Sequence, residues 1–224
     1  MGRHFDNELR DLKFSLLAMA GLVEEMIGLT RQAFTERSNA KADRVIALDE
    51  NVDQLELSLD QACIDLLALR APFASDLRLL ASTLKIIPEL ERIGDHCTNI
   101  ARRVKFISSE PHIQTSDQIE RLGEETESMV KRAMDAFVNG DAALAQAVIE
   151  DDDRVDDLYV QVSKDMLQIM LSDPSAIERA SHLIILVKNW ERIADQATNI
   201  AEEVLFILEG VNVKHAYLHQ KRGF

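Results

Sequence analysis

An eleven-residue segment occurs twice in this chain of 224 residues, one hundred positions apart. The first copy, ERIGDHCTNIA, begins at Glu91, and the second, ERIADQATNIA, begins at Glu191. Eight of the eleven positions are identical, including the Glu, Asp, Thr and Asn residues. An internal repeat at a fixed spacing indicates a structural unit that is present twice. The fold is therefore constrained to two similar halves.

A second pair of segments extends the repeat. VIALDENVDQLELSL begins at Val45 and matches VIEDDDRVDDLYVQV, which begins at Val148, at an offset of 103. Because this offset differs by three from that of the first pair, the length difference is expected in a loop, where insertions cost little. We predict a first unit over residues 1–110, a second over 111–211 and a tail over 212–224.

The apolar residues recur with the 3.6-residue period of amphipathic helices. Only 8 glycines and 4 prolines interrupt the chain, which also favours long helices. The predicted fold class is all-α, a tandem duplication of an antiparallel three-helix bundle. Ser75 and Asp76 are the expected cap residues of the third helix. Six helices are predicted, over residues 6–38, 42–69, 75–107, 117–138, 142–171 and 175–208.

The composition excludes several classes of function. The chain carries 25 Lys and Arg residues against 39 Asp and Glu, a net charge of −14, so nucleic acid is not an expected partner. No signal peptide is expected, and the uncharged run at residues 14–23 is about half of the ~20 residues that span a bilayer. Cys63 and Cys97 form no CxxC motif and are expected to be buried thiols in a reducing cytoplasm.

The repeated motif places polar residues on one stripe of its helix. At 100° per residue, Glu91, Asp95 and Asn99 fall within an arc of about 80°, away from the apolar residues. His96 and Cys97 point away from this stripe and are interpreted as structural. Pro88, one turn before Glu91, is expected to kink the helix, whereas its counterpart in the second half is a lysine.

The preceding helix of each half carries a matching acidic stripe. In the first half its members are Asp49, Asp53, Glu56 and Asp60. In the second half Asp152 and Asp156 are retained, but Tyr159 and Ser163 replace the two outer carboxylates. Antiparallel packing would bring each stripe beside the stripe of the next helix. A set of ligands that are all oxygen atoms suits hard or borderline cations such as Mg²⁺, Mn²⁺, Ca²⁺, Fe or Zn²⁺. These residues do not determine which of these metals would bind.

A simpler interpretation is a solvated polar face, which any amphipathic surface helix shows. Two observations weigh against it. Like charges at i, i+4 destabilise an isolated helix by ~0.2–0.5 kcal/mol per pair, yet such pairs occur on two helices of each half. Thr and Asn are also mediocre helix formers, and both are present twice at the same positions.

The doubled E-R-I-x-D-x-x-x-N motif, each copy preceded by D-x-x-x-D, and the segment RAPFASDLRLL at residues 70–80 resemble the PhoU family of bacterial phosphate-specific transport. The resemblance covers about residues 6–210 and implies a multinuclear metal cluster, of Fe, Zn, Mn or Mg, on each bundle. It implies no catalytic residues and no other cofactor. The ligands that it implies are Asp49, Asp53, Glu91, Asp95 and Asn99 in the first half, and Asp152, Asp156, Glu191, Asp195 and Asn199 in the second.

The same resemblance implies a role and partners. Members of the family are negative regulators of the phosphate-starvation response and link the phosphate ABC transporter to the sensor kinase PhoR. The implied partners are the ATPase subunit of the transporter, PhoR and a second copy of the chain. The implied location is the cytoplasm, with the membrane reached only through these partners.

Three alternatives stay open at this point. Related proteins accompany other phosphate transporters, so the partner could differ. Carboxylate-held metals can activate water, which would make the chain a metal-dependent hydrolase, although neither stripe carries a histidine base. The third alternative is a helical interaction module whose acidic stripes are only solvated.

Overall fold

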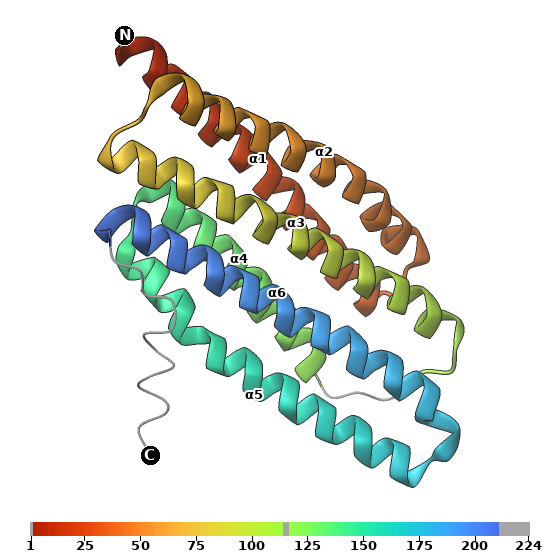
Figure 1. Ribbon diagram of the computed structural model, residues 1–224. Coiled ribbons are helices and arrows are strands. Elements are labelled where there is room, and N and C mark those ends of the chain that lie inside the picture. The colour runs from red at the N-terminus through yellow and green to blue at the C-terminus, as the bar shows by residue number, and fades with distance from the viewer. Residues whose placement is uncertain (1, 114–116, 211–224) are drawn as a thin grey trace, which may run out of the picture.

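The chain forms an all-helical bundle, shown by a computed structural model that describes residues 2–113 and 117–210 (Figure 1). Within these residues there is no strand, as the sequence predicts. The predicted tail, residues 212–224, lies outside the described residues. The long helices are α1 (Gly2–Thr35), α2 (Asn39–Arg70), α3 (Ala74–Ser109), α4 (Gln118–Asn139), α5 (Ala142–Ser172) and α6 (Ile177–Glu209), with a short 3-10 turn, η1 (Pro174–Ala176), before α6.

The helix ends show why the chain turns where it does. Gly140 adopts a left-handed conformation, with φ of 63°, directly after α4, and Asp141 then caps α5 by accepting a hydrogen bond from Leu144 N at 3.0 Å. Ser38 caps α2 in the same way. The prediction that Ser75 and Asp76 cap α3 is wrong, because α3 begins at Ala74 and both residues lie in its first turn.

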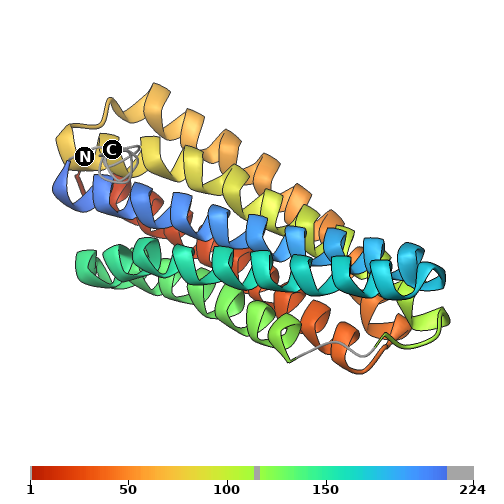
Figure 2. The same cartoon turned by 90° about the horizontal axis from the view of Figure 1, so that it is seen from below.

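The two halves pack together through their third helices. α3 and α6 run antiparallel, side by side, in the middle of the molecule, and make the most extensive helix–helix contact (Figure 1). α2 lies on the outer side of α3, and α5 on the outer side of α6. α1 and α4 also contact each other, and all six helices run roughly along one long axis (Figure 2).

The apolar stripes of the helices form one continuous core. Leu16 and Met26 of α1, Ile86 and Ile93 of α3, and Trp190 of α6 are all at most 1% exposed. Trp190 is therefore a core residue. No helix in the described part of the chain is long and apolar enough to cross a membrane.

Candidate functional site

The acidic stripes of α2 and α3 form one electrostatic cluster in the first half. Asp53 and Asp95 both raise the pKa of Asp49, after burial as the largest cause. The partly buried Asp49 also lies 3.5 Å from the position that a Cβ on Gly94 would occupy, so it sits against α3. Acidic residues of the two stripes therefore lie close enough for Asp53 and Asp95 to act on Asp49.

Glu91 is the carboxylate most strongly affected by this cluster. Burial first, and then the charges of Asp95, Glu56, Asp53 and Asp49, raise its pKa to about 7. Arg92 pairs with Glu89 at 2.8 Å rather than with a cluster member. Among the described residues, no Lys or Arg nitrogen forms an ion pair with these carboxylates. The carboxylates of the first cluster thus repel one another, and the charges of Arg102 and Arg92 offset this only partly, at Asp49 and at Glu56.

The second half repeats the arrangement on α5 and α6. Burial raises the pKa of Asp195 to about 7, with further contributions from Glu191, Asp152 and Asp156. Glu191 is buried, at 8% exposure, although its counterpart Glu91 is only partly buried. The other three predicted carboxylates of the second half therefore all act electrostatically on Asp195.

The second cluster includes a lysine, Lys188 of α6. Lys188 Nζ forms an ion pair with Glu191, three residues along α6, and its charge lowers the pKa of Asp195. Sequence reasoning considered this position only for its lack of a proline. The opposite charges at i, i+3 were the available signal.

The two predicted asparagine ligands lie one turn beyond the Asp residues of their motifs. Asn199 donates a hydrogen bond from Nδ2 to Glu89 Oε2 at 3.1 Å, so its amide nitrogen faces α3 across the interface between the halves. Asn99 is partly buried. The neighbouring Thr198 hydroxyl donates to Asp152 at 3.4 Å, which links α6 to α5 beside the cluster.

The clusters are electrostatic groupings rather than ready-made coordination shells. Over residues 2–113 and 117–210, no three His, Cys, Asp or Glu side chains are arranged so that they could hold a metal ion. The donor chemistry nevertheless fits a hard cation in the first cluster, because six carboxylates without a paired cation repel one another. Binding would require these side chains to rotate toward a shared ion. The metal assignment stays a prediction.

His96 and Cys97 lie off the stripe, as predicted. His96 Nδ1 is 3.1 Å from Asn189 Oδ1 of α6. Because Asn189 uses its Nδ2 to donate to Ile185 O at 2.7 Å, the His96 ring nitrogen is the donor in this pair. Cys63 and Cys97 are both buried free thiols, also as predicted, and burial raises the pKa of Cys63 to about 12.

A buried ionic contact between the halves was missed by the sequence reasoning. Glu203 of α6 is 3% exposed and accepts hydrogen bonds from Ser82 at 2.9 Å and from Lys85 at 3.1 Å. Its counterpart in α3 is Arg103, so the repeat gave no signal for it. This contact ties the first turns of α3 to the last turns of α6.

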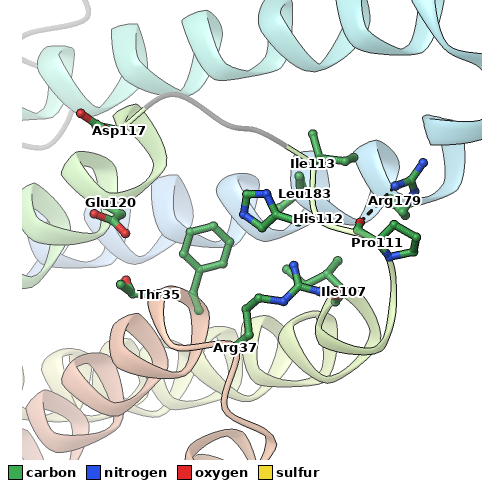
Figure 3. A pocket seen from close by; sticks show the side chains of 11 residues that line it. Thr35, Arg37, Ile107, Pro111, His112, Ile113, Asp117, Glu120, Arg179 and Leu183 are labelled. Carbon is green, nitrogen blue, oxygen red and sulfur yellow. Dashed lines mark hydrogen bonds between the residues drawn. The ribbon is translucent and has the colours of Figure 1, made fainter.

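A cavity of about 230 Å³ lies apart from both clusters, where the end of α1 and the end of α3 meet α6 (Figure 3). Arg37 donates to the carbonyl oxygens of Ile107, at 2.5 Å, and Glu110, at 2.6 Å, and Arg179 donates to Pro111 O at 3.0 Å. None of the ten predicted ligands lines it. Its lining residues are Phe34, Thr35, Arg37, Ile107, Pro111, His112, Ile113, Asp117, Glu120, Arg179 and Leu183.

The fold and clusters together define an all-helical protein of two three-helix repeats, each with an acidic cluster on its last two helices. The family model described as the PhoU domain matches the chain twice, over residues 16–104 and 119–204. These two matches cover most of the chain. The chain therefore belongs to the PhoU family.

Relatives of similar length support this membership. A phosphate-specific transport system accessory protein PhoU homolog from Pseudomonas aeruginosa is 36% identical over 96% of this chain and 89% of its own length. Another from Aquifex aeolicus is 37% identical over 96% of this chain and 97% of its own length. The crystal structure of PhoU from Pseudomonas aeruginosa superimposes with a TM-score of 0.90, at 37% identity, over 92% of this chain and all of that chain (100%). The phosphate transport system regulatory protein PhoU from Streptococcus pneumoniae gives a TM-score of 0.87 at 28% identity, over 93% of this chain and 99% of that chain.

Proposed function

We propose that this chain is an accessory protein of a phosphate-specific transport system and a negative regulator of the phosphate-starvation response. The observation that carries the proposal is that both halves match the PhoU domain and that relatives bearing this name align over nearly the whole chain. In this proposal the chain is a non-catalytic scaffold in the cytoplasm. It acts as a dimer and couples the ATPase subunit of the phosphate ABC transporter to the sensor kinase PhoR.

The regulatory part is tested by deleting the gene and measuring a reporter of phosphate-starvation genes in phosphate-rich medium. Loss of repression, restored by the wild-type gene, is the expected result. A reporter that stays repressed in the deletion strain contradicts the proposal. Co-purification with the ATPase subunit and the cytoplasmic part of PhoR tests the partners, and recovery of a different phosphate transporter would support the related alternative.

We also propose that the acidic clusters bind metal, as Fe, Zn, Mn or Mg in multinuclear clusters. The support is the crowding of carboxylates around Glu91 and Asp195: burial first, and then the charges of neighbouring carboxylates, raise the pKa of both groups, and a bound cation would relieve that repulsion. A metal bound there would supply positive charge, and the carboxylates of α2, α3, α5 and α6 would orient it. Its ligands would be Asp49, Asp53, Glu91, Asp95 and Asn99, and Asp152, Asp156, Glu191, Asp195 and Asn199.

Elemental analysis of protein purified without chelator tests this ligand assignment. We expect the double variant Asp95→Ala, Asp195→Ala to lose most of its metal. A control with Asp11→Ala and Asp135→Ala, which removes two exposed carboxylates on α1 and α4, should keep it. If the double cluster variant keeps the full metal content, the ligand assignment is wrong. Phosphoesterase turnover by the metal-loaded protein that Asp95→Ala abolishes would instead favour the hydrolase.

A further inference from the structure

One of the equivalent positions at which the two clusters differ carries a lysine in the second half only. Lys188 of α6 corresponds to Pro88 of α3 at the offset of 100. The Lys188 ammonium forms an ion pair with Glu191, one turn further along, and the Glu191 side chain is 11% exposed. Proline at the corresponding position has no charged side chain and supplies no cation to Glu91.

A second substitution places an aromatic ring beneath the same ammonium. Tyr159 of α5 corresponds to Glu56 of α2 at the offset of 103. Lys188 Nζ lies 5.0 Å from the centre of the Tyr159 ring, within the range of a cation–π contact. In the first half Glu56 instead contributes another negative charge to the cluster around Glu91. The two differences therefore act together, and each makes the second cluster less negative.

The two clusters differ in their number of carboxylates and in how their cations are placed. The first cluster contains six carboxylates, Asp49, Asp53, Glu56, Asp60, Glu91 and Asp95. The charge of Arg102, whose counterpart in the second half is Glu202, lowers the pKa of Asp49, but Arg102 forms no ion pair with these carboxylates among the described residues. The second contains four, Asp152, Asp156, Glu191 and Asp195, together with the Lys188 ammonium. The charge of the ligand set is one of the factors that tune the affinity of a carboxylate site for divalent cations. An incoming metal must also displace Lys188 before it can use the ion-paired oxygen of Glu191.

We propose that Lys188 is a built-in cation of the second cluster, so that divalent metal ions bind the first cluster in preference to the second. The inference rests on the metal binding proposed above. It adds that the two clusters are unequal, and it names the residue responsible. Lys188 substitutes for a metal charge at Glu191, and Tyr159 holds the ammonium in place.

The metal affinity of each cluster can be measured separately in single variants. Asp95→Ala disables the first cluster and leaves the second, whereas Asp195→Ala leaves the first. Equilibrium dialysis against Mn²⁺, followed by elemental analysis, gives the affinity of each remaining cluster. We expect the Asp195→Ala protein to bind Mn²⁺ about tenfold more tightly than the Asp95→Ala protein, or better.

Lys188 itself is tested in the Asp95→Ala background. Lys188→Met removes the charge and keeps an unbranched apolar stem, and we expect it to raise the Mn²⁺ affinity of the second cluster by about tenfold. Lys188→Arg keeps the charge and should leave the affinity low. Pro88→Lys in the Asp195→Ala background should weaken the first cluster, and this test does not depend on the folding of any Lys188 variant. Circular dichroism melting curves check that each variant is folded.

The outcomes distinguish failure of the Lys188 inference from failure of the proposal that the clusters bind metal. Equal Mn²⁺ affinity of the two clusters, unchanged by Lys188→Met and by Pro88→Lys, overturns the inference and leaves metal binding intact. A wild-type protein that binds no metal at either cluster overturns the metal proposal, and the inference with it. Preference for the first cluster that is lost in Lys188→Met, but retained in Lys188→Arg, supports both.

Discussion

The two acidic clusters occupy equivalent places in the two halves, yet only the second has a lysine ion-paired to one of its carboxylates in the part of the chain that the structure describes. In the first half, burial and neighbouring carboxylates raise the pKa of Glu91 to about 7, with no ion-paired cation among the described residues. In the second half, Lys188 pairs with Glu191 and lies over Tyr159. Side-chain differences on the same backbone scaffold thus give one cluster an ion-paired lysine and the other none within residues 2–113 and 117–210.

The ends of the α3–α6 interface show a similar divergence. At one end, Lys85 lies 5.3 Å from the ring centre of Phe206 and bonds to Glu203. At the other end, His182 stacks on Phe106, with ring centres 3.7 Å apart, and the charge of Arg103 helps to lower the pKa of His182, after burial as the main cause. Each half therefore keeps the aromatic residue and changes the polar partners around it.

The largest effect that would test the equivalence of the halves is in the core. Trp190 is 1% exposed and its counterpart Leu90 is 0% exposed. Because a larger side chain leaves a larger cavity, we expect Trp190→Ala to destabilise the protein by about 3–5 kcal/mol and Leu90→Ala by less, about 2–4 kcal/mol. Urea unfolding followed by circular dichroism measures both. A cost of Trp190→Ala smaller than that of Leu90→Ala would contradict this ranking.

The next effect concerns the buried contact between the halves. Glu203→Ala leaves the buried Ser82 hydroxyl and the Lys85 ammonium without this partner, so we expect a loss of about 2 kcal/mol. Glu203→Gln can still accept from both groups and should cost about half as much. Arg103→Ala is the matched variant at the opposite end, and we expect it to cost less than about 1 kcal/mol. Equal losses for Glu203→Ala and Arg103→Ala would show that the two ends are equivalent.

A smaller effect should appear in the dependence of stability on pH. The pKa of Glu91 in the folded protein, about 7, lies above its ordinary value of 4.5. The folded state therefore holds a proton that the unfolded chain releases, and stability falls as pH rises from about 4.5 to about 7. We expect Glu91→Gln to stabilise the metal-free protein at pH 8 by roughly 0.5–1 kcal/mol, after allowance for solvent screening, and to have little effect at pH 4.

Thermal unfolding in the presence of EDTA, at both pH values, measures this difference. Asp195→Asn is the matched variant of the second half and should act in the same direction, because the pKa of Asp195 is also raised to about 7. A Glu91→Gln variant that is less stable than the wild type at pH 8 would mean that the first cluster is not self-repelling.

The smallest effect concerns the position in the repeated motif where the first copy has Gly94 and the second has Ala194. A Cβ on Gly94 would lie 3.5 Å from Asp49 Oδ1 and 3.6 Å from Val52 Cγ1, which are ordinary contacts. Because alanine loses less conformational entropy than glycine in a helix, Gly94→Ala should stabilise the protein by about 0.5 kcal/mol. Ala194→Gly, the reverse change in the second half, should cost a similar amount. Loss of stability in Gly94→Ala, measured by urea unfolding, would indicate that Asp49 needs the space.

The fold could be predicted almost completely from the sequence, because its determinants are local or repeated. Helix positions follow from the 3.6-residue period of the apolar residues, and the turn at Gly140 and Asp141 follows from residue types that favour such turns. The error at Ser75 and Asp76 has a local cause too: α3 starts one residue earlier, after a cap residue, Phe73, that makes no side-chain hydrogen bond.

The candidate site was only partly predictable. The angular positions of Glu91 and Asp95 follow from helix geometry, and the convergence with α2 follows from antiparallel packing. The position of Lys188 over the Tyr159 ring could not be predicted, because it depends on the distance between two helices and on a side-chain rotamer. Metal occupancy stays a prediction for both clusters.

The repeat and the apolar periodicity alone determine that this chain forms two three-helix units, and which face of each helix carries carboxylates. Such patterns operate within one helix, where geometry is fixed by the backbone. Only the tertiary structure decided how α3 and α6 join the halves, that Glu203 is buried there, and that the second cluster contains its own cation. These features depend on contacts between residues that are distant in the chain, and on burial, which sets how strongly charges interact.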